Sequence, residues 1–352
     1  MLAAVFEGTE KINLREVPTP EVGDGDLLLR VRAATICGTD LKIVAGKKTR
    51  GVRIPSILGH EIAGEIIAVG AQVAGWRAGE FVAVAPVIAC GECYYCGRDL
   101  ENLCARRKAL GYEYEGGFAE FLRVPAPAVS AGNVLRLPTD LSCQAAALSE
   151  PLSCCINGQD NMGGIKPGDT VLIIGAGPIG TMHMQLAKAV PQTRVIVSET
   201  LAQRRRMALE NGADAVHDPD DTDIYQRVMD ETSGLGADKI ILAVGIADLV
   251  NHLLCLTRKN GAINLFAGFS AGAMARLDIN EIHYRQIRIS GASASTTSQF
   301  KRALDLIAAG AIDAGALVSE RFSLERFPDA WQCARAGQGL KVAIIPDGRE
   351  SA

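Results

Sequence analysis

Residues 170–180 read TVLIIGAGPIG, a short apolar run followed by a G-x-G-x-x-G string. The run predicts a buried strand, and the apolar residues after Gly180 predict a helix, so the glycines occupy a strand-to-helix turn. Gly175 permits a tight turn, Gly177 lets the backbone approach a pyrophosphate, and Gly180 allows close packing of helix on strand. The helix N-terminus then favours phosphate. The alternative is an ordinary strand–turn–helix without a ligand.

From Lys166 onward, strand-like and helix-like segments alternate, which predicts a parallel sheet covered by helices. The expected strands are Thr170–Ile174, Arg194–Ser198, Lys239–Val244 and Ala262–Ala267, and the expected helices are Gly177–Ala189, Leu201–Asn211 and Leu249–Thr257. The first 150 residues are instead rich in β-branched runs, at Leu27–Ile36, Glu61–Val69 and Glu80–Pro86. The tail is mixed, with a helix over Gln299–Ala309 and a strand over Val342–Ile345.

An acidic residue follows the second strand of this alternating region. Glu199 stands about 20 residues after the glycines, where a carboxylate can bind both ribose hydroxyls of a dinucleotide and repel a 2′-phosphate. The sequence therefore favours NAD over NADP. Arg204, Arg205 and Arg206 could pair with a phosphate, or one could stack on adenine; a solvated basic helix face is the simpler interpretation.

Composition limits the classes of function. The 352 residues suggest about two domains, and a net charge of −4 without a long basic run does not indicate binding to nucleic acid or an anionic membrane. No secretory signal and no apolar segment of membrane-spanning length is visible. Ten cysteines are too sparse for a disulfide-built domain, so a reducing cytoplasm is expected.

A run of four cysteines reads C-x2-C-x2-C-x7-C, formed by Cys90, Cys93, Cys96 and Cys104. Four thiolates close a tetrahedron around zinc and leave no position open for a substrate, so this pattern predicts a structural site. Iron is the alternative metal. A nucleic-acid-binding zinc module is another alternative, and only Arg106-Arg107-Lys108 supports it.

A second group of possible metal ligands comprises Cys37, His60, Glu61 and Glu150. Thiolate, imidazole and carboxylate all bind zinc, and three protein ligands with one open position define a catalytic site. Each residue taken singly is as readily a core or hydrogen-bonding residue, and separation along the chain does not establish proximity.

These motifs, taken together and in order, resemble the zinc-dependent medium-chain dehydrogenases, in the branch of sorbitol and other polyol dehydrogenases. The similarity rests on Cys37-Gly38-Thr39-Asp40, Gly59-His60-Glu61, the four cysteines, Glu150-Pro151-Leu152 and the glycine string, and it continues to Lys341-Val342. It implies a GroES-like β-rich catalytic domain over residues 1–150 and 291–352, with a structural-zinc lobe at about 88–106. It also implies a doubly wound Rossmann NAD-binding domain over residues 151–290.

The resemblance also implies roles for residues. Cys37 and His60 would bind the catalytic zinc directly, Glu61 and Glu150 would supply carboxylate ligation, and Glu150 in place of a cysteine is similar to sorbitol, xylitol and threonine dehydrogenases. Thr39 would relay a proton towards the nicotinamide ribose, although Lys42 replaces the usual distal histidine. The cofactor would contact Gly175, Gly177, Pro178, Ile179, Gly180, Glu199, Arg204, Val244 and Ala267. Cys154 and Cys155 are expected to be small buried helix residues.

The expected enzyme transfers hydride from a secondary alcohol of a polyol, or of its phosphate, to NAD+ and yields a ketose. The residues 112–118 are expected to form a loop whose acidic groups suit several hydroxyls, whereas Gly291–Ser295 replaces the Arg-Tyr pair of sorbitol dehydrogenases. Alternatives are a threonine 3-dehydrogenase or other secondary-alcohol dehydrogenase, and a zinc-stabilised dinucleotide-binding sensor or structural protein. The expected cofactors are two zinc ions and NAD, and a homo-oligomer is expected to pair through a sheet edge near Leu277–Ile289.

Overall fold

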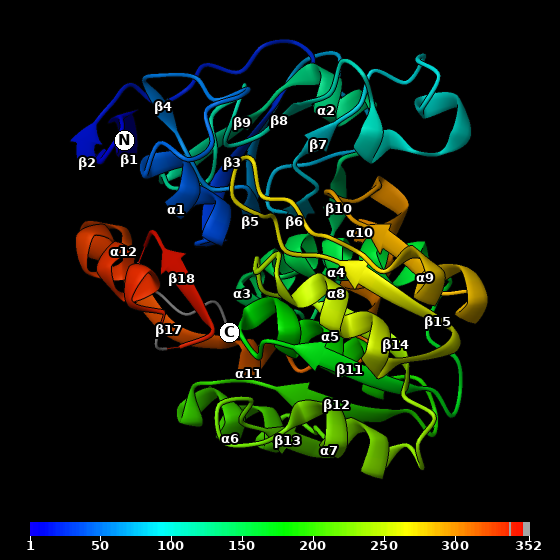
Figure 1. Cartoon of the computed structure of the whole chain (residues 1–352). Helices are drawn as coiled ribbons and strands as arrows, with labels where there is room; N and C mark the ends of the chain where they lie inside the picture. The colour runs from blue at the N-terminus through cyan, green and yellow to red at the C-terminus, as the bar shows by residue number, and fades with distance from the viewer. Residues whose placement is uncertain (338, 348–352) are drawn as a thin grey trace. The chain divides into compact units, whose positions relative to one another are not determined.

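The computed structural model describes residues 1–337 and 339–347, so the expected residues 348–352 of the catalytic domain lie outside the described part. The chain forms two compact units (Figure 1). Unit 1 comprises Met1–Ser153 and Ala294–Ala352, and unit 2 comprises Cys154–Ser293.

Unit 1 is built on a seven-stranded sheet in the order β10-β6-β5-β3-β18-β17, with β9 also paired to β3. The N-terminal strands of unit 1, in this sheet and outside it, are β1 (Leu2–Gly8), β2 (Lys11–Glu16), β3 (Leu27–Thr35), β4 (Ser56–Ile57), β5 (Glu61–Val69), β6 (Phe81–Val84), β7 (Val87–Ile88), β8 (Lys108–Ala109), β9 (Phe121–Val124) and β10 (Val134–Arg136). Its N-terminal helices are α1 (Gly38–Val44), α2 (Ala126–Ser130), α3 (Cys143–Ala147) and the start of α4 (Ser149–Asn161).

The C-terminal segment completes this sheet. It contains α10 (Thr297–Ala308), α11 (Ala314–Leu317), β17 (Val318–Ser323), α12 (Phe327–Ala336) and β18 (Lys341–Ile345). Because β18 pairs with β3, with Ala343 opposite Thr35, the last strand lies in the middle of the sheet rather than at its edge. The C-terminal segment therefore returns to the sheet that the N-terminal strands form.

Unit 2 contains a six-stranded parallel sheet in the order β13-β12-β11-β14-β15-β16 (Figure 1). The strands are β11 (Thr170–Ile174), β12 (Arg194–Ser198), β13 (Ala215–His217), β14 (Ala237–Leu242), β15 (Thr257–Leu265) and β16 (Arg288–Gly291). The helices are α5 (Pro178–Lys188), α6 (Ala202–Glu210), α7 (Ile224–Glu231), α8 (Leu249–Leu256) and α9 (Ile279–Arg285).

Helices cover both faces of this parallel sheet. Leu172 and Ile174 of β11 pack with Val228 of α7 and Leu253 of α8. The intervening residue Ile173 belongs to the opposite core, with side chains of α5 and α6. Alternate residues of one strand thus face two helical layers, which explains its continuous apolar sequence and confirms the doubly wound fold.

The predicted strands and helices of unit 2 are confirmed, with ends that shift by a few residues. The edge of the sheet was expected near Leu277–Ile289, but the edge strand begins only at Arg288 and ends at Gly291. Residues Ile279–Arg285 form helix α9, capped by the Asp278 side chain, and the edge strand is β16. Among the described helices, none combines the length and hydrophobicity that crossing a membrane requires.

Candidate active site

Cys37 lies where strand β3 gives way to helix α1. The Cys37 sulfur accepts the N–H of Thr39 at 3.4 Å, and the Cys37 N–H donates to Oδ2 of Asp40 at 2.9 Å. Cys37 and Asp40 thus form a capping box at the start of α1. The cap satisfies backbone groups at the start of the helix and fixes the position of the Cys37 thiol. Thr39, in the first turn of the same helix, is partly buried.

His60 precedes β5 and is 5% exposed. Its Nδ1 lies 3.3 Å from Oδ1 of Asp40, so Asp40 contacts both the backbone of Cys37 and the ring of His60. Such a carboxylate orients an imidazole and leaves Nε2 for a ligand. Gly59 has φ +88°, and a side chain there would meet Phe118 at 2.7 Å, so only glycine places His60 here.

Tyr112 packs against His60, with 5.5 Å between the ring centroids. Burial lowers the pKa of His60, but interactions with Tyr112, Asp40 and Cys37 outweigh it and raise the pKa well above its ordinary value. A metal ion binds only the neutral imidazole, so binding of a metal ion at His60 would release the proton that the imidazolium carries.

Glu61 begins β5 and has no solvent exposure. Its carboxylate accepts a hydrogen bond from Thr35 Oγ1, and Lys341 Nζ contacts both of its oxygens, at 2.6 Å from Oε2. Sequence reasoning missed this partner, although a lysine in the apolar strand Lys341–Ile345 was a visible signal. Burial lowers the pKa of Lys341, and Glu61 more than offsets it, so the pKa lies above its ordinary value.

Ligand atoms of Cys37, His60 and Glu61 all lie within 4.8 Å of one another. Glu150 does not belong to this set at that distance. It occupies the first turn of α4, is 8% exposed, and is close enough to influence the pKa values of Tyr112 and Lys341. The structure therefore brings three of the four predicted residues together and places the fourth in their surroundings.

The sulfur atoms of Cys90, Cys93, Cys96 and Cys104 form a second cluster, again within 4.8 Å. The Cys93–Cys96 and Cys90–Cys96 sulfur distances are 3.5 and 4.0 Å. A tetrahedron with metal–sulfur bonds of about 2.3 Å has an edge of about 3.8 Å, so the spacing fits one zinc ion. Backbone N–H groups of Cys96 and Ala105 lower the pKa of Cys93 to about 6, which favours the thiolate.

The glycine turn in unit 2 has the geometry that the string predicts. Gly175 has φ +96°, and a side chain at Gly180 would lie 1.9 Å from the carbonyl oxygen of Gly175. Gly177 caps α5, followed by Pro178 and Ile179. Val244 packs against the turn, because a side chain added at Gly175 would lie 2.6 Å from the Val244 side chain. The backbone N–H of Ala267 donates to the carbonyl oxygen of Leu242, at the end of β14.

Glu199 directly follows β12 and is buried against the same turn. One carboxylate oxygen accepts the N–H of Ala176 at 2.7 Å, and the other accepts that of Leu201 at 2.9 Å. The three arginines after it differ: Arg205 pairs with Asp218 at 2.6 Å, Arg206 is exposed, and Arg204 lies 3.5 Å from the position of a Gly177 side chain. Arg204 is thus positioned beside Gly177 of the turn, while Arg205 also donates to the carbonyl oxygen of Glu199 at 2.9 Å.

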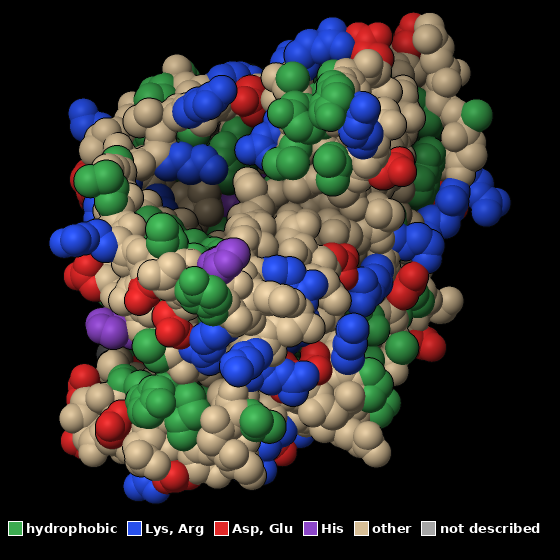
Figure 2. Space-filling view, turned by 45° about the vertical axis from the view of Figure 1, so that its right-hand side comes forward, with side chains coloured by type: hydrophobic (Ala, Val, Ile, Leu, Met, Phe, Trp, Pro, Cys, Tyr) green, Lys and Arg blue, Asp and Glu red, His purple; other side chains and the backbone are tan. Residues whose placement is uncertain are grey.

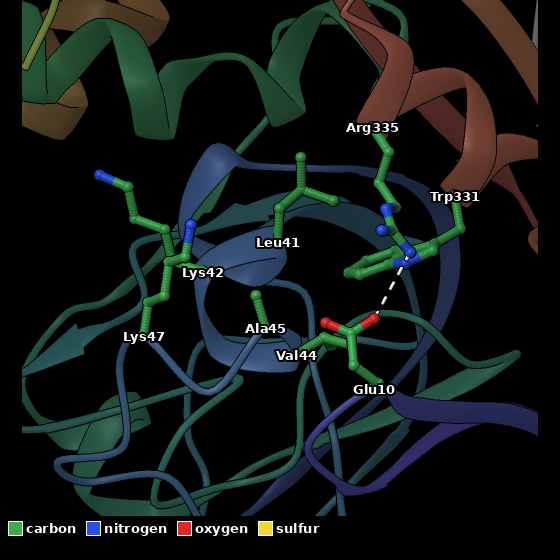
Figure 3. A pocket seen from close by; sticks show the side chains of 8 residues that line it. All are labelled: Glu10, Leu41, Lys42, Val44, Ala45, Lys47, Trp331 and Arg335. Atoms are coloured by element: carbon green, nitrogen blue, oxygen red, sulfur yellow. Dashed lines mark ion pairs between the residues drawn. The ribbon is translucent and has the colours of Figure 1, made fainter.

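A cavity of about 230 Å³ lies beside α1, between Leu41, Lys42 and Lys47 on one side and Trp331 and Arg335 on the other (Figure 3). Arg335 is 3.5 Å from Glu10 across it. None of the metal-type ligands lines this cavity, so it is separate from the site described above.

Comparison with known proteins gives the family. Residues 23–135 match the alcohol dehydrogenase GroES-like domain, and residues 178–309 match the zinc-binding dehydrogenase family. The chain belongs to the zinc-binding dehydrogenases of the alcohol dehydrogenase type. The resemblance seen in the sequence is thereby confirmed.

Relatives within the zinc-binding dehydrogenases cover nearly the whole chain. D-arabitol-phosphate dehydrogenase of Enterococcus avium is 31% identical over 97% of this chain and 96% of its own length. L-threonine 3-dehydrogenase of Pyrococcus furiosus is 32% identical over 94% of both chains. A zinc-binding dehydrogenase of Sinorhizobium meliloti 1021, solved with bound NADP, superposes with a TM-score of 0.89 at 33% identity, covering 98% of this chain and 99% of that one.

Membership of the zinc-binding dehydrogenases makes this protein an NAD(P)-dependent alcohol oxidoreductase that uses zinc. The residues present fit that metal, since one cluster offers four thiolates and the other offers thiolate, imidazole and carboxylate.

Proposed function

We propose that this enzyme oxidises a secondary alcohol of a polyol, or of a polyol phosphate, to a ketose with NAD+ as hydride acceptor. The observation that carries the proposal is the close group of partly buried Cys37 with buried His60 and Glu61, with Glu150 on α4. A glutamate at residue 150, in place of a cysteine, resembles the polyol branch.

The proposed catalytic metal residues are Cys37, His60 and Glu150. Glu61 is bound by Lys341 and Thr35, which holds its carboxylate in place beside Cys37 and His60. By the resemblance to the polyol branch, we assign Glu150 as the carboxylate that completes the site, directly or through water, and Glu61 as a ligand that exchanges with it. Zinc held there supplies a Lewis acid that acidifies the substrate hydroxyl.

The substrate proton is assigned to Thr39. Its hydroxyl lies two residues beyond the Cys37 thiol, in the first turn of α1. It would accept a hydrogen bond from the substrate hydroxyl and relay that proton towards the nicotinamide ribose by passing on its own, so that the alkoxide carbon can give hydride to NAD+. Lys42, one turn further along α1, is exposed where relatives carry a histidine, and we propose that the outer end of the relay releases the proton to bulk water.

NAD is the proposed cofactor because Glu199 places a carboxylate beside the glycine turn, where a 2′-phosphate would be repelled. We assign Gly175, Gly177, Pro178, Ile179, Gly180, Arg204, Val244 and Ala267 to the same site. The second zinc belongs to the four cysteines, which gives two zinc ions per chain.

A homo-oligomer, dimer or tetramer, is proposed from the open edge strand β16, near which Met274, Ile279 and Tyr284 expose most of their side chains. A cytoplasmic location is proposed because the ten cysteines form no disulfide in the described residues. On the face in Figure 2, basic side chains lie among acidic ones, which supports a small-molecule partner over nucleic acid.

Oxidation of threonine is the second candidate, supported by the Pyrococcus furiosus relative. The decisive test is NADH formation by the zinc-loaded enzyme with pentitols, hexitols, their phosphates, threonine and simple alcohols, and with NADP+ in parallel. We expect NAD+-dependent turnover that favours some polyols. Turnover of threonine alone would select the second candidate, and NADH binding without any turnover would indicate a sensor or structural protein.

A further inference from the structure

Two buried serines, Ser153 and Ser295, form a hydrogen bond between segments 142 positions apart in the chain. Their hydroxyl oxygens lie 2.6 Å apart, and the two residues are 0% and 7% exposed. Unit 1 consists of one piece of chain that ends at Ser153 and a second that begins at Ala294, so this bond links the two pieces. Ser295 also ends the segment Gly291–Ser295, which stands where sorbitol dehydrogenases carry an Arg-Tyr pair. The structure therefore gives this segment a contact that the resemblance does not supply.

The hydrogen bonds of Ser153 run in one direction, towards Glu150. The Ser153 hydroxyl lies 2.6 Å from the backbone carbonyl oxygen of Glu150, one turn earlier in α4. Because a carbonyl oxygen cannot donate, Ser153 uses its single hydroxyl proton there, and Ser295 donates to Ser153. The three groups form a chain of hydrogen bonds in which each bond polarises the next. Ser295 thereby acts on the first turn of α4, which carries the carboxylate of Glu150.

The backbone around Ser295 is fixed on both sides. Ala294 has φ +56°, in the left-handed region that a residue with a Cβ seldom occupies, and surrounding contacts must hold it there. Thr296 follows Ser295 and forms the N-cap of α10 with its hydroxyl. The N–H of Thr297 donates at 2.9 Å to the carboxylate of Glu101, in the lobe that holds the four cysteines. Ser295 thus presents its hydroxyl from a rigid support.

We propose that Ser295 and Ser153 are positioning residues that hold the carboxylate of Glu150 at the catalytic metal site. Through the first turn of α4 they set how this carboxylate meets a metal ion bound by Cys37 and His60. The inference rests on the proposed function, which assigns Glu150 to that site. Groups that orient a metal ligand contribute about 10-fold to 100-fold in metal affinity or activity, and a contact made through the backbone belongs at the lower end of that range.

Ser295→Ala tests this role in protein that carries zinc in the four-cysteine lobe and Co2+ at the catalytic site. The visible absorption of Co2+ reports the geometry of its ligands. We expect a shifted spectrum, and about tenfold weaker retention of the catalytic-site metal in competition with a chelator. The kcat for polyols should fall by about tenfold as well. An unshifted spectrum together with unchanged metal retention would overturn the proposal.

Ser298→Ala is the matched control, because it removes a hydroxyl from the first turn of the same helix. Ser298 is exposed, and its hydroxyl bonds that of Thr296 at 2.9 Å. We expect the Co2+ spectrum and the metal retention of Ser298→Ala to match those of the unchanged protein. An equal shift in Ser298→Ala and Ser295→Ala would show a general loosening of α10 and would refute the role of Ser295.

Double variants trace the route by which Ser295 acts. If Ser295 acts through Ser153 on the carboxylate of Glu150, Ser295→Ala should add no further spectral shift to Ser153→Ala or to Glu150→Ala, because the effects of residues in one line of contacts are not additive. A second shift that adds fully in either double variant would show that Ser295 reaches the metal site by another route, and the proposal would fail.

The Co2+ spectra need no turnover, so they separate this inference from the proposed function. If the protein oxidises no alcohol but Ser295→Ala and Glu150→Ala both shift the spectrum, the positioning role stands and the proposed reaction fails. If Glu150→Ala shifts the spectrum and Ser295→Ala does not, the positioning role fails alone. If Glu150→Ala leaves the spectrum unchanged, the assignment of Glu150 in the proposed function is wrong, and this inference falls with it.

Discussion

Lys341 Nζ lies 2.6 Å from Oε2 of Glu61, and neither side chain is more than 4% exposed. The lysine lies on β18 near the C-terminus and the glutamate begins β5, so the contact joins residues 280 positions apart. Thr35 of β3, the strand between them in the sheet, also bonds the carboxylate. The closing segment of the chain thus supplies the counter-charge for a carboxylate of the candidate metal site.

Loss of Lys341 should destabilise unit 1. Lys341→Met leaves Glu61 charged and buried, and removal of one partner of a buried pair costs about 3–5 kcal/mol. We expect a lower denaturant midpoint in the zinc-loaded protein, and partial recovery in the double variant Lys341→Met/Glu61→Gln. Lys301→Met, which breaks the exposed pair with Asp305, is the control and should change the midpoint little. Equal midpoints for both lysine variants would contradict the role of the pair.

Glu199→Ala should weaken the binding of NAD and reduce the preference of the enzyme for NAD over NADP. The carboxylate supports the glycine turn through Ala176 and is positioned for the ribose hydroxyls, so we expect the KM for NAD+ to rise by about tenfold or more. Glu199→Gln keeps an acceptor for the turn and removes the charge, which separates the two effects. An unchanged ratio of NAD+ to NADP+ efficiency in both variants would rule out the assigned role.

Cys96→Ser should remove one zinc ion per chain and lower the melting temperature. Cys96 lies at the centre of the sulfur cluster, close to both Cys90 and Cys93, so its loss opens the tetrahedron. Metal analysis and a thermal melt measure the two effects. Cys255→Ser, at an exposed cysteine outside both clusters, is the control. A normal melt with full zinc content for Cys96→Ser would count against the structural site.

Protonation of buried His183 should make the protein acid-sensitive. Burial lowers the pKa of His183 to about 3, against about 6.5 in the unfolded chain. The unfolded state therefore binds a proton first, and the stability falls as the pH drops below about 6.5. Between pH 7 and pH 5 the loss amounts to about 2 kcal/mol.

His183→Gln removes this titration, and comparison with the unchanged protein cancels the contributions of other groups. We expect the variant to lose about 2 kcal/mol less of its unfolding free energy between pH 7 and pH 5, measured in denaturant. Parallel pH profiles for the two proteins would show that His183 takes up its proton without unfolding.

The order and type of most elements in unit 2 could be predicted because they depend on local sequence. Continuous apolar runs such as Val171–Ile174 mark strands buried on both faces, and Gly175 and Gly180 are required by a positive φ and by a close backbone contact. The edge region was predicted less well, because Asp278 caps a helix that the apolar residues alone do not reveal.

The sequence by itself determined the family motifs, the alternation of strands and helices, and the two sets of metal-type ligands, because short spacings and periodicity encode them. Tertiary structure decided which groups surround those ligands. Lys341 reaches Glu61, and Lys48 reaches Tyr112 and through it His60, only because strands and loops far apart in the chain pack together. Such contacts depend on the packing of the whole unit, and no local pattern records them.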